Sequence, residues 1–158
     1  MGRSAGSVLI SSQLAQYFKD YASYHKTRGN KVTHYFGITF IVVSLLGLMS
    51  NLVVGESGLT GSYYFRVDGG TIILILALIR YVFIDWKITI PFSLVAFGLY
   101  FLGRSIPTPI NWVLFVGGWI LQGIGHYVYE KKSPAFFQNL THLLIGPLWI
   151  FARLIGYR

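Results

Sequence analysis

Residues 118–130 read GWILQGIGHYVYE, and the predictions of fold and site both start from this stretch. Its first half is apolar and is typical of a helix that lies in lipid. Its second half places His126 and Glu130 four residues apart, a spacing that puts both side chains on one face of a helix. Histidine and glutamate are both metal-ligand residues, and a metal site at the end of this helix would need further ligands from elsewhere in the chain. The remaining histidines of the chain are His25, His34 and His142.

The composition predicts a membrane protein with a single domain over residues 1–158. Hydrophobic residues make up 54% of the chain and charged residues 11%, against about a quarter charged in soluble domains. A chain of 158 residues has too little interior to bury so much apolar surface, and lipid is the natural solvent for the excess. The absence of cysteine excludes disulfides and thiolate metal sites.

The hydropathy pattern predicts an all-α integral membrane bundle with four spanning helices. The four predicted spans cover residues 34–54, 69–86, 88–102 and 110–129. An amphipathic helix over Ser7–Tyr24 is expected to lie on the membrane surface. Residues 143–155 are apolar but short and are interrupted by Pro147, which favours a re-entrant or interfacial helix, with a fifth span as the alternative.

The basic residues predict the orientation of this bundle. With four spans both termini share one side of the bilayer, and only Arg66 and Arg104 fall on the opposite side. The side of the termini collects Arg3, Lys19, Lys26, Arg28, Lys31, Arg80, Lys87, Lys131, Lys132, Arg153 and Arg158. The positive-inside rule makes this side cytoplasmic, so the net charge of +8 reflects topology and not nucleic-acid binding. All four histidines fall on this same side.

Four histidines on one membrane face predict a metal site. Neutral imidazole offers a lone pair without carrying charge into a site of low dielectric constant. Glu130 can complete a site of two histidines and one carboxylate, can orient His126, or can form a surface ion pair with Lys131 or Lys132. A ligand set of nitrogen and oxygen without cysteine points to iron, manganese or zinc. Asn30 and Gln122 can bind the head group of a substrate or cap helices.

Residues at both ends of the chain resemble a known family in the right order. The N-terminal match comprises Ser12-Gln13-Leu14, Tyr24-His25, Asn30 and His34. The C-terminal match comprises Gly118-Trp119, Gln122, Gly125-His126, Glu130-Lys131, Pro134-Ala135, Asn139-Leu140 and Pro147. Both resemble the signatures of the fungal 2-hydroxy fatty acid dioxygenases and their bacterial relatives. Between residues 55 and 109 only the apolar spans match.

The resemblance implies an Fe(II)-dependent membrane dioxygenase. Such enzymes use O2 to remove one carbon from a 2-hydroxy fatty acid, a step of alpha-oxidation in the breakdown of phytosphingosine. The implied iron ligands are His25, His34 and His126. His142 stands where the fungal proteins have glutamine, and is either a fourth ligand or a pocket residue.

Two other functions compete with this one. A zinc-dependent membrane hydrolase would use Glu130 as general base beside a histidine-bound water. A non-enzymatic lipid-binding scaffold would hold no metal and would tolerate the loss of His25.

Overall fold

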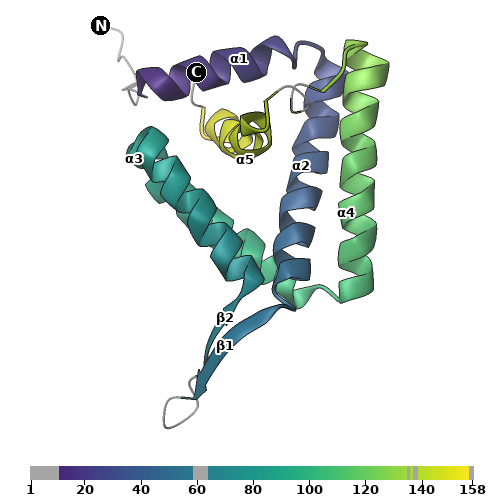
Figure 1. Cartoon of the computed structure of the whole chain (residues 1–158). Helices are drawn as coiled ribbons and strands as arrows, with labels where there is room; N and C mark the ends of the chain where they lie inside the picture. The colour runs from purple at the N-terminus through teal and green to yellow at the C-terminus, as the bar shows by residue number, and fades with distance from the viewer. Residues whose placement is uncertain (1–10, 59–63, 135, 137–138, 157–158) are drawn as a thin grey trace, which may run out of the picture.

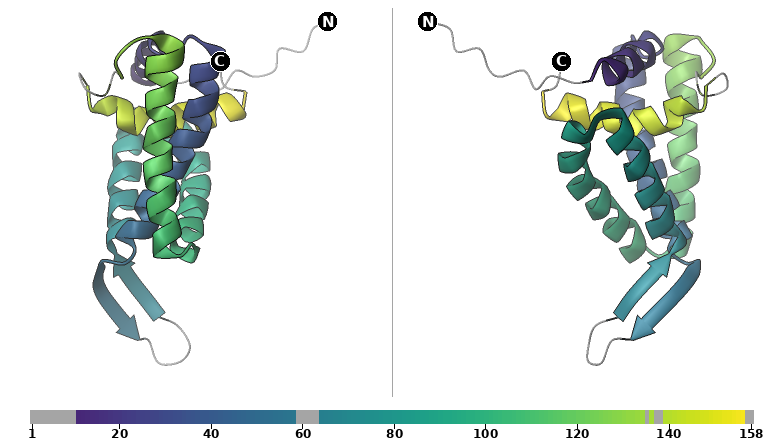
Figure 2. Two further views of the ribbon diagram at one scale, coloured as in Figure 1. Left: turned by 90° about the vertical axis from the view of Figure 1, so that its right-hand side faces the viewer. Right: turned by 60° about the vertical axis from the view of Figure 1, so that its left-hand side comes forward.

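The computed structural model describes residues 11–58, 64–134, 136 and 139–156. Its elements are α1 (Ser12–Ser23), α2 (Arg28–Met49), β1 (Val53–Gly58), β2 (Tyr64–Asp68), α3 (Gly69–Ser105), α4 (Thr108–Gly123), the π-helix η1 (Ile124–Glu130) and α5 (Thr141–Leu154). Helices α2, α3 and α4 stand side by side, and α1 and α5 lie across one end of them (Figure 1). The β1–β2 hairpin projects from the opposite end (Figures 1 and 2).

Helix α2 is the central element and packs against α4, η1, α3 and α5. The side chain of Thr27 caps its start by accepting a hydrogen bond from the backbone of Asn30. Glycines let the backbones of α2 and α4 approach closely. A Cβ added at Gly118 would lie 2.8 Å from the carbonyl oxygen of Gly37 and 2.7 Å from Ile41 Cγ1. No larger residue fits at this crossing without moving the helices apart.

Helix α3 bends at Asp85, whose φ of −161° and ψ of 103° are not helical. The Asp85 carboxylate accepts hydrogen bonds from the backbone N–H of Lys87 at 3.0 Å and from that of Ser11 at 2.7 Å. It therefore caps the second half of α3 and ties the start of α1 to the bend. The boundary predicted between the spans 69–86 and 88–102 falls next to this bend, inside one element.

Helix α5 forms much of the core, although Pro147 lies within it. It crosses the upright helices next to α1, as both views of Figure 2 show. The most buried core residues that it supplies are Ile145, Leu148, Trp149 and Ala152. Helix α1 meets it with Leu14 and Tyr21, so the amphipathic helix predicted near the N-terminus covers the core. Its predicted first residues, 7–10, lie outside the described part.

The prediction of a bundle of four spanning helices is wrong. Within the described ranges, α2 is the one helix that is long and apolar enough to cross a membrane. The α-helical part of the fourth predicted span has 16 residues, or about 24 Å, against a hydrocarbon thickness of about 30 Å. The second and third predicted spans are the two arms of the bent α3. A hydropathy window counts apolar residues but does not detect where a helix bends or changes type.

The sequence also failed to predict the hairpin. The prediction placed no strand between the spans 34–54 and 69–86, but β1 and β2 pair antiparallel there. The hairpin is anchored by Asp68, which is fully buried and accepts a hydrogen bond from the Tyr100 hydroxyl at 2.7 Å. The same carboxylate caps α3 through the backbone N–H of Thr71.

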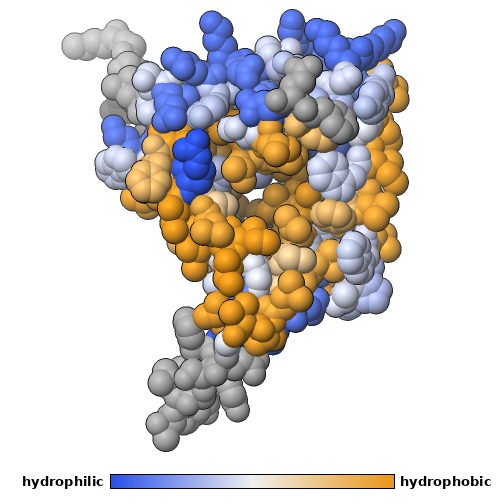
Figure 3. Space-filling model, viewed as in Figure 1, coloured by the Kyte–Doolittle hydropathy of each residue, from blue (hydrophilic) through white to orange (hydrophobic). Residues whose placement is uncertain are grey.

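Much of the outer surface is apolar. Phe83, Leu94 and Val113 are each more than 70% exposed, at 76%, 77% and 71%. Figure 3 shows apolar side chains over the faces of the upright helices and polar side chains at the end where α1 lies. A contiguous apolar surface of this kind marks a region of contact with lipid or with another apolar surface.

The close packing of α2 and α4 gives a first prediction. Gly118→Ala is expected to lower the free energy of unfolding by about 1–3 kcal/mol, because the added methyl group meets the backbone of α2. The matched control is Gly117→Ala on the same helix, where an added Cβ meets nothing within 4 Å. The control should be neutral or stabilising by up to about 1 kcal/mol. Thermal unfolding compares the two, and equal stabilities would contradict the close approach.

Candidate metal centre

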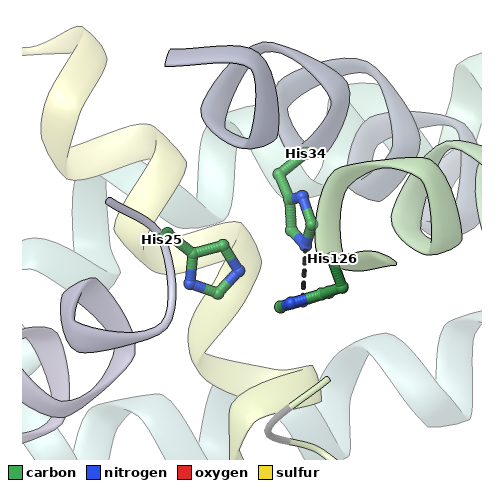
Figure 4. A group of neighbouring side chains, drawn as sticks. All are labelled: His25, His34 and His126. Carbon is green, nitrogen blue, oxygen red and sulfur yellow. Dashed lines mark hydrogen bonds between the residues drawn. The ribbon is translucent and has the colours of Figure 1, made fainter. Parts of the chain in front are cut away.

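Three buried histidines from different parts of the chain meet at one point. His25 follows α1, His34 lies in the first turns of α2, and His126 lies in η1. One ring nitrogen from each lies within 4.8 Å of the others, and the rings are 2%, 1% and 2% exposed. Figure 4 shows the three rings converging from separate segments. The sequence predicted that these three histidines would lie together.

Backbone carbonyls fix the protonation of two of the rings. His25 Nδ1 lies 2.7 Å from the carbonyl oxygen of Tyr21, and His34 Nδ1 lies 2.9 Å from that of Asn30. Since a carbonyl oxygen only accepts, Nδ1 carries the proton in both rings. In the neutral rings the Nε2 lone pairs are therefore available, which is the state that a metal ligand requires.

The spacing of the rings suits a shared cation. His34 Nε2 and His126 Nε2 are 3.1 Å apart. Two nitrogens bound to one ion at about 2.1 Å are separated by about 3.0–3.4 Å for angles between 90° and tetrahedral. His25 Nε2 and His126 Nδ1 are buried with no hydrogen-bond partner in the described part of the chain. These orphaned buried nitrogens and the short separation fit a metal ion held by the three histidines.

A π-helix and a glycine bring His126 to this point. At Gly125 a Cβ would lie 2.5 Å from Asn30 Oδ1 and 2.8 Å from His34 Cε1. The absence of a side chain at Gly125 therefore lets η1 lie directly against α2. Residues of a π-helix are wound differently from those of an α-helix, and such turns occur frequently at functional sites. No feature of the sequence predicted the π-helix.

Burial keeps the site neutral. It lowers the pKa of His25 to about 4, although the hydrogen bond to Tyr21 acts in the opposite direction. It also lowers the pKa of His126, with Glu130 acting in the opposite direction. Both rings are therefore neutral at neutral pH, and each has one nitrogen that can ligate an ion without first losing a proton.

Asn30 connects the segments that carry the histidines. It is fully buried, its side-chain amide donates to the carbonyl oxygen of Tyr24 at 3.1 Å, and its own carbonyl accepts from His34. It thus joins the residue before His25 to the ring of His34. The sequence predicted Asn30 as a substrate-binding residue, but it does not line the cavity described below.

Glu130 holds the backbone at the start of α2. Its Oε1 accepts hydrogen bonds from the backbone N–H groups of Lys26 and, at 2.7 Å, of Thr27. Burial raises the pKa of the Glu130 carboxyl, but the hydrogen bonds, first the one from Thr27, outweigh this effect and lower the pKa overall. The carboxylate ties the end of η1 to the loop beside His25. Its predicted catalytic role stays a prediction, and its hydrogen bonds favour a positioning role.

His142 lies near the three histidines but outside their group. Its Nε2 is 2.8 Å from Asp20 Oδ2, and its ring stands edge-on to Tyr24 at 5.4 Å. Among the described residues, the group whose ligand atoms lie within 4.8 Å of one another contains His25, His34 and His126. The sequence offered no way to find the pairing with Asp20, which lies 122 residues away in the chain.

A cavity of about 290 Å³ opens next to the site. Its polar wall consists of Tyr21, His25, His34, Gln122, His126 and His142. Its remaining walls are apolar and come from α2, α3, α4 and α5, and Figure 3 shows a hollow among these apolar side chains. Gln122 Nε2 is buried at the cavity and has no hydrogen-bond partner within the described ranges. Gln122 therefore stays a candidate for binding a polar head group.

A comparison with models of protein families adds to this geometry. The model described as "2-hydroxy-palmitic acid dioxygenase Mpo1-like" matches residues 11–158. The chain belongs to this family. The match confirms the resemblance seen in the sequence and extends it over almost the whole chain. No curated protein and no solved structure shows significant similarity.

The family name indicates a dioxygenase that acts on a 2-hydroxy fatty acid. This activity agrees with three histidines that can hold a metal ion beside an apolar cavity. The ligand roles of the individual histidines stay predictions, and so does the identity of the metal.

The hydrogen bonds of Glu130 give a second prediction. Glu130→Gln should keep the bound metal and lower the free energy of unfolding by about 1 kcal/mol, because charge-assisted hydrogen bonds become neutral. The pKa of Glu130 is lowered in the folded state, so this contribution is present above the ordinary pKa of glutamate and is lost as the pH falls. Thermal unfolding at several pH values and metal analysis measure the two effects. Loss of the metal in the glutamine variant would make Glu130 a ligand.

Proposed function

We propose that the protein is an Fe(II)-dependent dioxygenase that shortens a 2-hydroxy fatty acid by one carbon. The observation that carries this proposal is the convergence of three neutral, buried imidazoles at the polar end of an apolar cavity. The family name supplies the substrate class. The histidines offer a place for the polar head group of such a substrate, and the apolar cavity offers a place for its acyl tail.

The overall reaction balances without an external reductant. A 2-hydroxy acid, RCH(OH)COOH, and O2 give RCOOH, CO2 and water. Iron(II), when bound, supplies the electrons that activate O2 and a centre that the hydroxyl and carboxylate groups can chelate. The three histidines are neutral ligands, so the full positive charge of the ion remains available to attract the carboxylate.

The apolar wall of the cavity suits an acyl chain. One stripe of α2 lines it from His34 to Leu46, about 18 Å at about 1.5 Å per residue. The residues of this stripe are His34, Ile38, Ile41, Val42, Leu45 and Leu46. The head group would lie at the histidines and the tail along the stripe. The same wall excludes water from the reacting end.

The alternative of a zinc hydrolase is less well supported. It depends on Glu130 as general base, but the Oε1 of that carboxylate accepts hydrogen bonds from the backbone of Lys26 and Thr27. The alternative of a scaffold without metal leaves unexplained why three buried imidazoles face one another. Measurements of metal content and oxygen consumption distinguish both alternatives from the dioxygenase.

We also propose that the apolar outer surface lies in lipid, with the metal centre at the cytoplasmic side. The exposed apolar side chains on the upright helices support the first part. The basic residues of α1, of the start of α2 and of the segment directly after η1 lie at the same end as the histidines, which supports the second part. Fatty acids partition into lipid, so a cavity within this surface would receive its substrate from there.

The third prediction tests the reaction and the site together. Protein purified without oxygen and loaded with Fe(II) should consume O2 in the presence of 2-hydroxyhexadecanoic acid and release pentadecanoic acid. Hexadecanoic acid and 3-hydroxyhexadecanoic acid should cause no uptake, because they cannot present a hydroxyl group and a carboxylate on adjacent carbons. An oxygen electrode and mass spectrometry of the products measure this. Ester hydrolysis by the zinc form without O2 uptake by the iron form would reject the proposal.

In the same assay His126→Ala should lose the metal and the activity while the protein still folds. The matched control is Tyr127→Ala, the neighbouring residue of η1, which is 59% exposed. The control should keep both metal and activity. Stoichiometric iron in the His126 variant would remove His126 from the ligand set.

The fourth prediction concerns chain length. Ala96 is buried and lines the cavity on the second arm of α3, eleven residues beyond the bend at Asp85. Ala96→Phe should fill part of the cavity and shift the preferred substrate to shorter 2-hydroxy acids, at least tenfold in relative kcat/KM, with the metal retained. Gly98→Phe is the control, because a Cβ at Gly98 meets nothing within 4 Å. Competition between acids of different length measures the shift, and an unchanged preference would place the acyl chain elsewhere.

A further inference from the structure

His142 and Asp20 form a polar pair between the cavity and the outer surface. The His142 ring is 8% exposed and lines the cavity, whereas the Asp20 side chain is 53% exposed. The two groups are 2.8 Å apart, from His142 Nε2 to Asp20 Oδ2. One end of the pair therefore reaches the enclosed space beside the three histidines, and the other end reaches the surface.

The chemistry of the pair determines which nitrogen of His142 has a lone pair. An ionised carboxylate only accepts, so Nε2 carries a proton and donates it to Asp20. In the neutral ring Nδ1 is then unprotonated. His142 Nδ1 is buried and has no hydrogen-bond partner in the described part of the chain. A base without a partner is thus held at the cavity by a carboxylate, which both orients an imidazole and stabilises its protonated form.

The surroundings of His142 contain few other charges. The titratable groups of the described residues that face it are Asp20 and Tyr21 of α1 and Tyr24 directly after α1, with His25 in the same cavity wall. His25 is held neutral by burial, which lowers its pKa to about 4. Asp20 is the carboxylate of this set, and its Oδ2 lies directly against His142 Nε2.

We propose that His142 accepts the proton of the substrate 2-hydroxyl group and that Asp20 passes a proton on to solvent. The O–H bond of the substrate breaks, an N–H bond forms at Nδ1, and the electron pair stays on the substrate oxygen. Nothing is oxidised or reduced in this step. One proton is taken back from solvent later, when the water molecule of the overall reaction forms. The inference rests on the proposed function, because it takes a 2-hydroxy acid as the occupant of the cavity. It concerns this chain and not the fungal proteins, which have glutamine at the position of His142.

The pair has a clear alternative role, which is to dock α5 against α1. A docking role predicts loss of stability and of ligand binding when the pair is broken, at every pH. A proton acceptor predicts loss of the rate alone, with a changed dependence on pH. A third role, as a fourth metal ligand, predicts loss of the metal.

The fifth prediction uses His142→Gln and Asp20→Asn. His142→Gln should keep one iron per chain, bind hexadecanoic acid within twofold of wild type and keep KM within twofold. Its kcat should fall about 100-fold, and the remaining rate should rise with pH between 6 and 9, because hydroxide replaces the lost base. Asp20→Asn, at an exposed position, should lower kcat about tenfold. Glu56→Gln in β1 removes the same charge and should leave kcat unchanged.

The measurements are metal analysis, quenching of tryptophan fluorescence by hexadecanoic acid, and steady-state oxygen consumption over the pH range. Loss of iron in His142→Gln would make His142 a ligand and overturn the proposal. A kcat within twofold of wild type would also overturn it, as would a rate lowered equally at every pH together with weakened fatty acid binding. If wild-type protein consumes no O2 with 2-hydroxy acids, the proposed function fails first, before any variant is compared.

Discussion

Two backbone carbonyl groups determine how the buried histidines are presented. Each belongs to the residue four positions before its histidine, Tyr21 for His25 and Asn30 for His34. Because a carbonyl oxygen only accepts, the proton stays on Nδ1 and the lone pair is on Nε2. The opposite tautomer would set a lone pair of Nδ1 against the lone pairs of the carbonyl oxygen. The ligand geometry is therefore a property of the local helix and loop, present before any metal binds.

The packing of the helices has to be accurate for these rings to meet. His34 and His126 come from α2 and η1, and their Nε2 atoms are 3.1 Å apart. Metal–ligand distances tolerate changes of only about 0.2 Å. Gly37, Gly118 and Gly125 let the backbones approach at positions where a Cβ would lie within 3 Å of the facing helix. A methyl group at these positions would shift the helices by more than the site can accept, so the apolar packing and the metal centre are coupled.

The sequence predicted that the histidines lie together, but it did not predict the number and form of the helices. His25, His34 and His126 could be placed together because the apolar segments and basic flanks put them at one end of the molecule. The number of spanning helices was wrong, because hydropathy does not show where a helix changes type: the α-helix in the fourth predicted span ends at Gly123 and a π-helix follows. The partners of Glu130 and His142 could not be predicted, since each bond joins residues more than 100 positions apart. Such contacts follow from the packing of whole helices and not from a local pattern.

In the proposed reaction, the division of the cavity into a polar and an apolar wall would let one site combine a strict requirement for the head group with tolerance for tails of different length. The polar wall consists of a few fixed groups, and each donates or accepts at a definite atom, so a hydroxyl group moved by one carbon would miss its partner. The apolar wall along α2 offers side chains such as Ile38, Val42 and Leu45, whose contacts have no direction. A longer or shorter chain changes the area of contact but not the position of the head group. In the proposed reaction the carbon that is lost is therefore always the one next to the carboxylate, whatever the length of the acid.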